Sequence, residues 1–121
     1  MPLHHRVLPD QALVLVEASG VLTDADVLAA QERLRTDPDF QNHYAELVDL
    51  QRVTSIAVSS ATVRQLAQQD LWGPHARRAF VVTSDVAFGL ARMFDLLTDE
   101  RGHELQVFTT MPEAREWLGI P

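Results

Sequence analysis

The sequence predicts an α/β fold with a mainly parallel, mixed five-stranded sheet and the order β-β-α-β-α-β-α-β-α. Short runs rich in Val and Leu alternate with segments whose apolar residues recur at helical spacing. Each helical segment follows Ser or Thr, the residue types that cap helix N-termini. Strands separated by helices of this length imply right-handed crossovers. The sequence contains no linker, repeat or low-complexity stretch, so we expect a single domain over residues 1–121.

The expected strands are short, and the first two are close enough in sequence to form a hairpin. Ser19-Gly20 is expected to end the second strand. In the last strand Leu105 and Val107 share one face, whereas Glu104 and Gln106 share the other. One face of the sheet is therefore expected to be less covered, and open to solvent, a ligand or a second subunit. The predicted strands are 3–8, 12–18, 44–50, 79–83 and 104–109.

Four helices are expected, each with its own start and stop signals. The first ends before Asp37-Pro38, because proline disfavours helical geometry in the preceding residue. Trp72-Gly73-Pro74 is expected to close the second helix. The third helix has an apolar stripe at Val86, Leu90, Met93 and Leu97. The predicted N-caps are Thr23, Ser59 or Ser60, Ser84 and Thr110.

The composition excludes several classes of chemistry. The chain lacks cysteine, which excludes disulfides and thiolate sites, and it lacks lysine, which excludes Schiff-base and P-loop lysines. Arginine as the sole basic type is typical of GC-rich coding, so we expect a bacterial source. The net charge is −7 and the arginines are scattered, which argues against nucleic-acid binding. The nearest approach to a basic patch is Arg77-Arg78, expected to open a strand.

The apolar runs are too short for membrane insertion. Residues 1–6 are not followed by the long apolar stretch of a signal peptide. No run approaches the roughly 20 apolar residues that span a bilayer. We therefore expect a cytoplasmic protein with no membrane span.

Several segments resemble a known family. Residues 47–50 (LVDL), 53–56 (VTSI) and 58–61 (VSSA) resemble the core of the STAS, or SpoIIAA-like, domains. Residues 87–94 and 107–118 resemble a bacterial family of stand-alone STAS-like proteins of uncharacterised function. The resemblance covers nearly the whole chain and implies the SpoIIAA-like fold. In regulatory members a serine at this helix start is phosphorylated, which implies Ser59 or Ser60 here, although Val58 and Ala61 depart from the family's Asp and Gly.

The candidate binding residues fall in two places. Helix N-termini should line the carboxyl edge of the strands, where open α/β folds bind ligands, which makes Ser59 and Ser60 candidates beside ordinary capping. Asp49 is expected near the end of a strand at that edge, where it would bond the next loop or hold a metal. On the third helix Phe88 and Arg92 form a candidate contact patch; the alternative is a surface ion pair of Arg92 with Asp95.

No catalytic or metal motif is present, and no cofactor is expected. The five histidines lack metal-ligand spacing and are expected to be solvated. We therefore predict a non-enzymatic STAS-type binding or regulatory module that acts through protein contact and forms a homodimer. The alternative is a carrier of a small molecule or lipid in a pocket between sheet and helices. A third hypothesis is an enzyme with a dispersed site, for which His75, His103 and Asp49 are the candidates.

Overall fold

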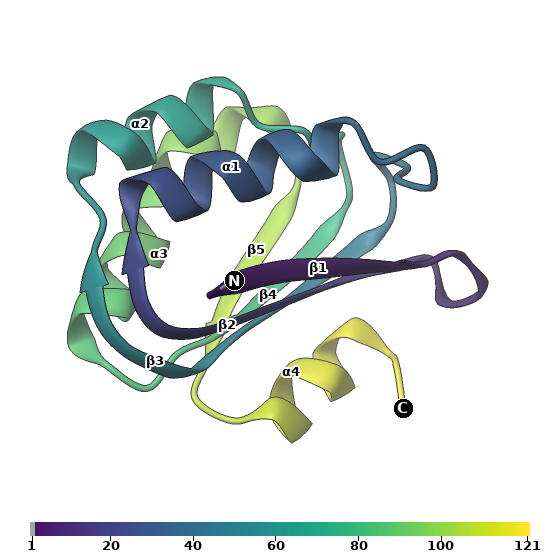
Figure 1. The fold of residues 1–121 in the computed structure, drawn as a ribbon. Coiled ribbons are helices and arrows are strands. Elements are labelled where there is room, and N and C mark those ends of the chain that lie inside the picture. Colours follow the sequence, from purple (N-terminus) through teal and green to yellow (C-terminus); the bar gives the residue numbers. More distant parts are fainter. Residues whose placement is uncertain (1) are drawn as a thin grey trace.

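The computed structural model describes residues 2–121, which form one five-stranded sheet with helices on both faces (Figure 1). The strands lie side by side in chain order, β1-β2-β3-β4-β5. β1 is antiparallel to β2, and the remaining pairs are parallel. The predicted mixed, mainly parallel sheet is thus confirmed. The strands are β1 (Leu3–Leu8), β2 (Leu13–Thr23), β3 (Ala45–Ala57), β4 (Arg77–Val81) and β5 (Glu104–Phe108).

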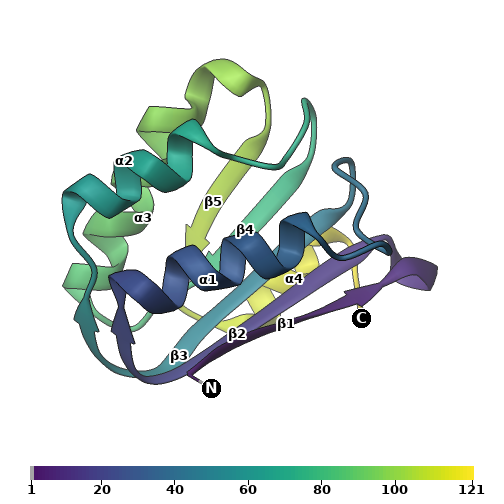
Figure 2. The same ribbon diagram turned by 45° about the horizontal axis from the view of Figure 1, so that its top comes forward.

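The helices are divided unequally between the two faces of the sheet. Three of them cover one face, and the fourth packs alone on the other (Figures 1 and 2). Because each of the first three joins two neighbouring parallel strands, their N-termini lie toward the same edge of the sheet. The helices are α1 (Asp24–Arg35), α2 (Ser60–Gln68), α3 (Asp85–Thr98) and α4 (Met111–Leu118), with short 3-10 turns at Pro9–Gln11 and Asp99–Arg101.

Three of the four predicted caps act as expected. Thr23 forms a capping box with Asp26, and the hydroxyls of Ser59 and Ser84 accept hydrogen bonds from the third residue of their helices. Thr110 also precedes its helix, but its hydroxyl accepts no backbone bond. It donates instead to Glu113 Oε1 at 2.8 Å.

The central strands are longer than predicted. Ser19-Gly20 does not end β2, because Gly20 adopts a φ of +69° within the strand and produces a register shift there. β2 therefore continues to Thr23 alongside β3, which runs to Ala57 instead of ending at 50. β4 begins and ends two residues earlier than predicted, and α2 ends at Gln68, before the predicted stop at Trp72.

Alternation along the strands separates two cores. Leu47 on β3 and Val81 on β4 pack against α4. The residues that alternate with them along the same two strands point to the opposite face, toward the other three helices. At the edge of the sheet, Glu104 and Gln106 are exposed and Leu105 is buried. The prediction of one less covered face is confirmed, since the single helix α4 leaves part of its side of the sheet open.

Candidate functional site

A cavity of about 190 Å³ lies between the sheet and the three helices on its more covered face. Most of its lining is apolar and comes from both layers. Examples are Val16, Val48 and Phe80 from the sheet and Ala30, Leu66 and Leu90 from the helices. Dry cavities of comparable size, about 150 Å³, can hold a molecule such as benzene. The cavity therefore has room for a small apolar ligand.

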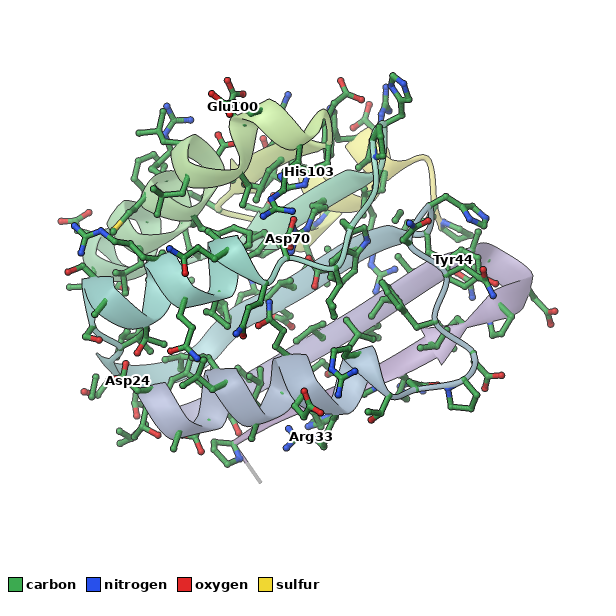
Figure 3. All side chains as sticks on the ribbon, turned by 90° about the horizontal axis from the view of Figure 1, so that it is seen from above. Asp24, Arg33, Tyr44, Asp70, Glu100 and His103 are labelled. Carbon is green, nitrogen blue, oxygen red and sulfur yellow. The ribbon has the colours of Figure 1, made fainter. Side chains whose placement is uncertain are left out.

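Helix α1 lies next to α2 (Figure 3), and two hydrogen-bonded contacts join them. At the start of the helices, Asp24 accepts from the Ser59 backbone N–H at 2.7 Å and from the Ser59 hydroxyl at 3.2 Å. Further along, the Gln31 side-chain amide donates to Leu66 O at 3.1 Å. Gln31 and Leu66 both line the cavity, so this second contact fixes the separation of the two helices there.

Arg78 is buried among charged and aromatic groups beside the cavity. It pairs in register with Glu46 on β3, so both side chains point to the same face of the sheet. Its Nε donates to Glu46 Oε1 at 2.9 Å, and its Nη1 donates to Asp70 Oδ1 at 3.0 Å. The guanidinium carbon lies 4.3 Å from the ring centre of Trp72 and 5.0 Å from that of Phe94. Arg78 is 4% exposed, so water screens these interactions little.

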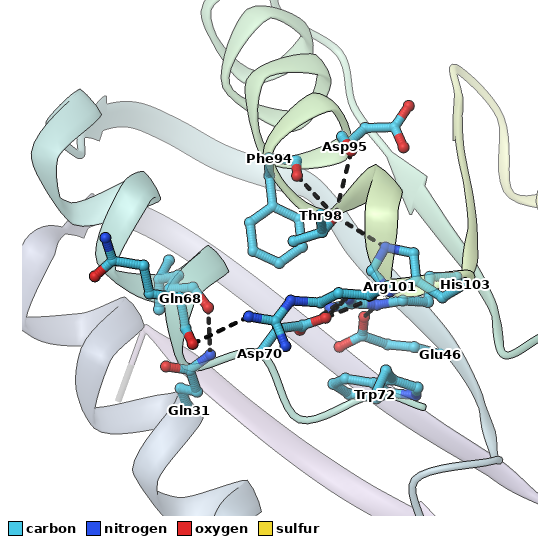
Figure 4. Close-up of polar contacts among 12 residues, drawn as sticks. Gln31, Glu46, Gln68, Asp70, Trp72, Phe94, Asp95, Thr98, Arg101 and His103 are labelled. Carbon is cyan, nitrogen blue, oxygen red and sulfur yellow. Dashed lines mark hydrogen bonds and ion pairs between the residues drawn. The ribbon is translucent and has the colours of Figure 1, made fainter. Parts of the chain in front are cut away.

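His103 extends this network away from the cavity (Figure 4). The Thr98 hydroxyl donates to Phe94 O at 2.8 Å and is also hydrogen-bonded to His103 Nε2 at 2.9 Å. His103 Nδ1 then faces Asp70 Oδ2 at 3.4 Å, without a well-aligned hydrogen bond among residues 2–121. The order Thr-His-Asp is that of a nucleophile relay, but Thr98 is fully buried and its hydrogen is already donated. The trio is therefore built to hold the network in place.

The pKa values of the two carboxylates of the network shift in opposite directions. Burial raises the pKa of Glu46 above its usual value, and the single bond from Arg78 does not compensate. Burial by itself would raise the pKa of Asp70 too. The His103 ring and the Arg78 guanidinium outweigh burial there, so the pKa of Asp70 lies below its usual value.

The predicted residues at the helix starts lie apart from this network. Ser59 and Ser60 are exposed, and Ser59 caps α2 while it contacts Asp24. A phosphate on Ser59 would set like charges against each other at that contact. Asp49 is not near the end of its strand, because β3 continues to Ala57. Its Oδ1 accepts from the Gln51 backbone N–H at 3.0 Å, a local bond of the kind expected for a loop.

Phe88 and Arg92 lie on the outer side of the molecule. Phe88 is 47% exposed, and Arg92 makes an ion pair with Asp95 at 3.6 Å. With β5 residues 105–107 they border a shallow hollow next to the edge strand. The structure thus brings Phe88 and Arg92 together, but it keeps them away from Ser59, Ser60 and Asp49, none of which borders that hollow.

The prediction that every histidine is solvated is wrong for His103. Its side chain is fully buried, because Thr98 and Asp70 supply polar partners inside the fold. His75 is exposed, and Asp49 contacts neither histidine in the hydrogen bonds of residues 2–121. His75 and His103 lie in adjoining loops, since the His75 backbone N–H donates to Gly102 O at 2.9 Å, but the first side chain is exposed and the second is buried.

The network of Glu46, Asp70, Arg78 and His103 was missed in the sequence. Arg77 and Arg78 resemble a basic patch in the sequence, but alternation in a strand places their side chains on opposite faces. Arg77 is exposed and Arg78 is buried. Two signals in the sequence point to the network. Arg78 lies two residues before Phe80, so both face the same side of a strand expected to be buried, and Glu46 is a charge within an apolar run.

Comparisons with known proteins support the fold. The structure is similar to the crystal structure of an uncharacterised protein of the DUF3478 family with a SpoIIAA-like fold from Shewanella loihica. The TM-score is 0.58 at 16% identity, and the match covers 88% of this chain and 83% of that one. No protein-family model matches the chain, and the search of curated proteins gave no match. The chain thus has a SpoIIAA-like fold, as the sequence predicted.

Two further features of the described residues bear on function. None of the helices within residues 2–121 combines the length and the apolarity needed to cross a membrane. Within the same residues, no three His, Asp or Glu side chains are grouped as metal ligands would be.

Proposed function

We propose that this protein is a STAS-type binding module that holds a small, mainly apolar molecule in the cavity between the sheet and helices α1, α2 and α3. The observation that carries the proposal is the apolar lining of that cavity, whose volume is about 190 Å³. Filling such a space with an apolar ligand removes ligand surface from water and restores missing packing contacts. Of the two functions that the sequence suggested, the carrier is the one for which the fold provides an interior site.

The size of the cavity limits the ligand. Pockets for drug-sized molecules usually measure about 300 to 1,000 Å³, well above the cavity here. We therefore expect a ligand of about six to ten non-hydrogen atoms, rather than a full-length lipid. Membrane lipids would need the helices to separate.

Two neighbouring alanines of α1 provide a matched test. Ala30 is half-buried and lines the cavity, whereas Ala29 is exposed. We expect Ala30→Leu to fill part of the cavity and to weaken binding of 2-heptanone at least tenfold, as measured by amide chemical-shift titration. Ala29→Leu changes the same residue type on the same helix and should leave binding unchanged. Native mass spectrometry of fresh protein adds a search for ligands that co-purify.

The proposal predicts a specific failure. If 2-heptanone shifts no resonances of the wild-type protein, and fresh protein shows only the mass of the free chain, the cavity is not a ligand site. Equal affinities of the Ala30→Leu and Ala29→Leu proteins would place any binding elsewhere.

A second candidate function is protein contact through α3, the surface that includes Phe88 and Arg92. Apolar side chains on this helix remain exposed, with Leu96 at 71% and Val86 at 58%. Exposed apolar groups gathered on one element are typical of interaction surfaces. We also propose that the protein self-associates, that it is cytoplasmic and that it comes from a bacterium.

Sedimentation velocity tests the α3 surface. We expect the wild-type protein to dimerise, and Phe88→Asp to shift it to the monomer, because a carboxylate replaces an apolar contact. Val21→Asp is the control, since Val21 is equally an exposed apolar residue, 53% exposed, but lies on β2. A wild-type protein that stays monomeric across the concentration range, or variants that behave alike, would contradict this role.

A further inference from the structure

Besides His103 Nδ1, two polar atoms of the charged network make no hydrogen bond within residues 2–121. Arg78 Nη2 and Glu46 Oε2 make no hydrogen bond to any of residues 2–121, although the neighbouring atoms of both side chains do. Both residues line the cavity, and they are 4% and 5% exposed. The buried side-chain atom left unpaired within residues 2–121 is His103 Nδ1, so Arg78 Nη2 and Glu46 Oε2 retain accessible surface. A donor and an acceptor that are accessible and unpaired at one cavity wall are available to a ligand.

We infer that these two atoms recognise the head group of the ligand, and that this head group is neutral and both accepts and donates hydrogen bonds. This inference rests on the proposed function. Arg78 Nη2 would donate to a carbonyl or hydroxyl oxygen of the ligand. Glu46 Oε2 would accept from an N–H or O–H of the same group. Primary amides and alcohols have this chemistry, and their apolar part would occupy the rest of the cavity.

The charge balance of the network selects against an anionic ligand. With both carboxylates ionised, Glu46 and Asp70 contribute two negative charges, and Arg78 contributes one positive charge. A proton on both nitrogens of His103 brings the sum only to zero. Arg78 therefore offers no surplus positive charge, and a carboxylate or phosphate would lie against Glu46 in a poorly screened environment.

The aromatic rings and the carboxylates around Arg78 hold its guanidinium in one orientation. Trp72 and Phe94 lie close to the Arg78 guanidinium at 4.3 and 5.0 Å, and its Nε and Nη1 are held by carboxylates. The guanidinium therefore cannot turn to follow a ligand, and Nη2 is presented in one orientation. Such pre-organisation lowers the entropic cost of binding and makes the geometry of the head group decisive.

Three ligands of equal size test this inference. Hexanamide, 2-heptanone and hexanoate share a five-carbon tail and a carbonyl, and they differ only in the group attached to that carbonyl. We expect hexanamide to bind about tenfold more tightly than 2-heptanone, which cannot donate to Glu46. Hexanoate should bind at least tenfold more weakly than 2-heptanone at pH 7. The measurement is the dissociation constant from chemical-shift titration.

Glu46→Gln isolates the contribution of the acceptor. The variant keeps the shape and an oxygen for Arg78 Nε, but it removes the negative charge. We expect the preference for hexanamide over 2-heptanone to fall to less than threefold, and hexanoate to gain affinity. Glu104→Gln is the control, because Glu104 on β5 pairs with Arg77 on β4 but is exposed and does not line the cavity. It should leave all three affinities unchanged, and urea unfolding would verify that both variants fold.

The outcomes separate this inference from the proposed function. If none of the three compounds binds, the proposed function fails. If all three bind within threefold of one another, or if hexanoate binds best, the cavity is a ligand site but the inferred head group is wrong. Persistence of the amide preference in Glu46→Gln would also overturn the role of Glu46.

Discussion

Replacing Arg78 with methionine is expected to lower the free energy of unfolding by about 3 to 5 kcal/mol, the usual cost of removing one partner from a buried ion pair. Glu46 and Asp70 would both lose their cation, and their side chains are 6% and 1% exposed. Methionine keeps a long flexible side chain between Trp72 and Phe94, so loss of charge rather than of volume dominates the effect.

The adjacent arginine supplies the control. Arg77 pairs with Glu104 at 3.3 Å, and both side chains are at least 50% exposed. Arg77→Met should therefore cost no more than about 1 kcal/mol. Urea denaturation at pH 7 measures both variants. Similar losses for the two arginines would mean that the buried network contributes no more than a surface ion pair.

A double variant separates the charge effect from the packing effect. Adding Glu46→Leu to Arg78→Met removes one of the carboxylates that the first change leaves without a cation. We expect the double variant to be more stable than Arg78→Met alone. A double-mutant cycle measures this coupling between the two substitutions. Simple addition of the two losses would contradict an electrostatic origin.

Asp70→Asn is expected to destabilise the protein by about 3 kcal/mol at pH 7, because it neutralises one member of the buried pair. The pKa of Asp70 is lowered in the folded state, so its ionised form stabilises the fold. That stabilisation is present above the unfolded-state pKa, about 3.9 for Asp, and is lost as the pH falls through the folded-state value. The difference between wild type and Asp70→Asn should therefore shrink on acidification.

Glu46→Gln should show the opposite dependence on pH. Burial raises the pKa of Glu46, so the folded state binds this proton more readily than the unfolded state does. The wild-type protein therefore loses stability at this position as the pH rises from the unfolded-state value of about 4.3 through the folded-state value. Relative to wild type, Glu46→Gln should look least stable at acid pH and should improve toward neutrality. Urea denaturation from pH 2 to 7 measures both variants; parallel pH profiles would contradict the opposite pKa shifts.

Local sequence determined the order and type of the elements. Caps such as Thr23, Ser59 and Ser84 and the alternation of apolar patterns depend on neighbours within a few residues, so they can be read along the chain. The boundaries of β2 and β3 could not, because these strands continue by pairing with each other past Gly20, over a sequence separation of more than 30 residues. Pairing with a neighbouring strand overrides a local turn signal.

Only the tertiary structure decided where the charges and the cavity lie. Asp70 follows α2, Arg78 is on β4, and His103 precedes β5, so their meeting depends on how the helices pack on the sheet. Sequence spacing carries no information on such a contact, and the same residue types are usually solvated. The cavity likewise results from the packing of three helices against the sheet, since its volume depends on distances between layers rather than on any single segment.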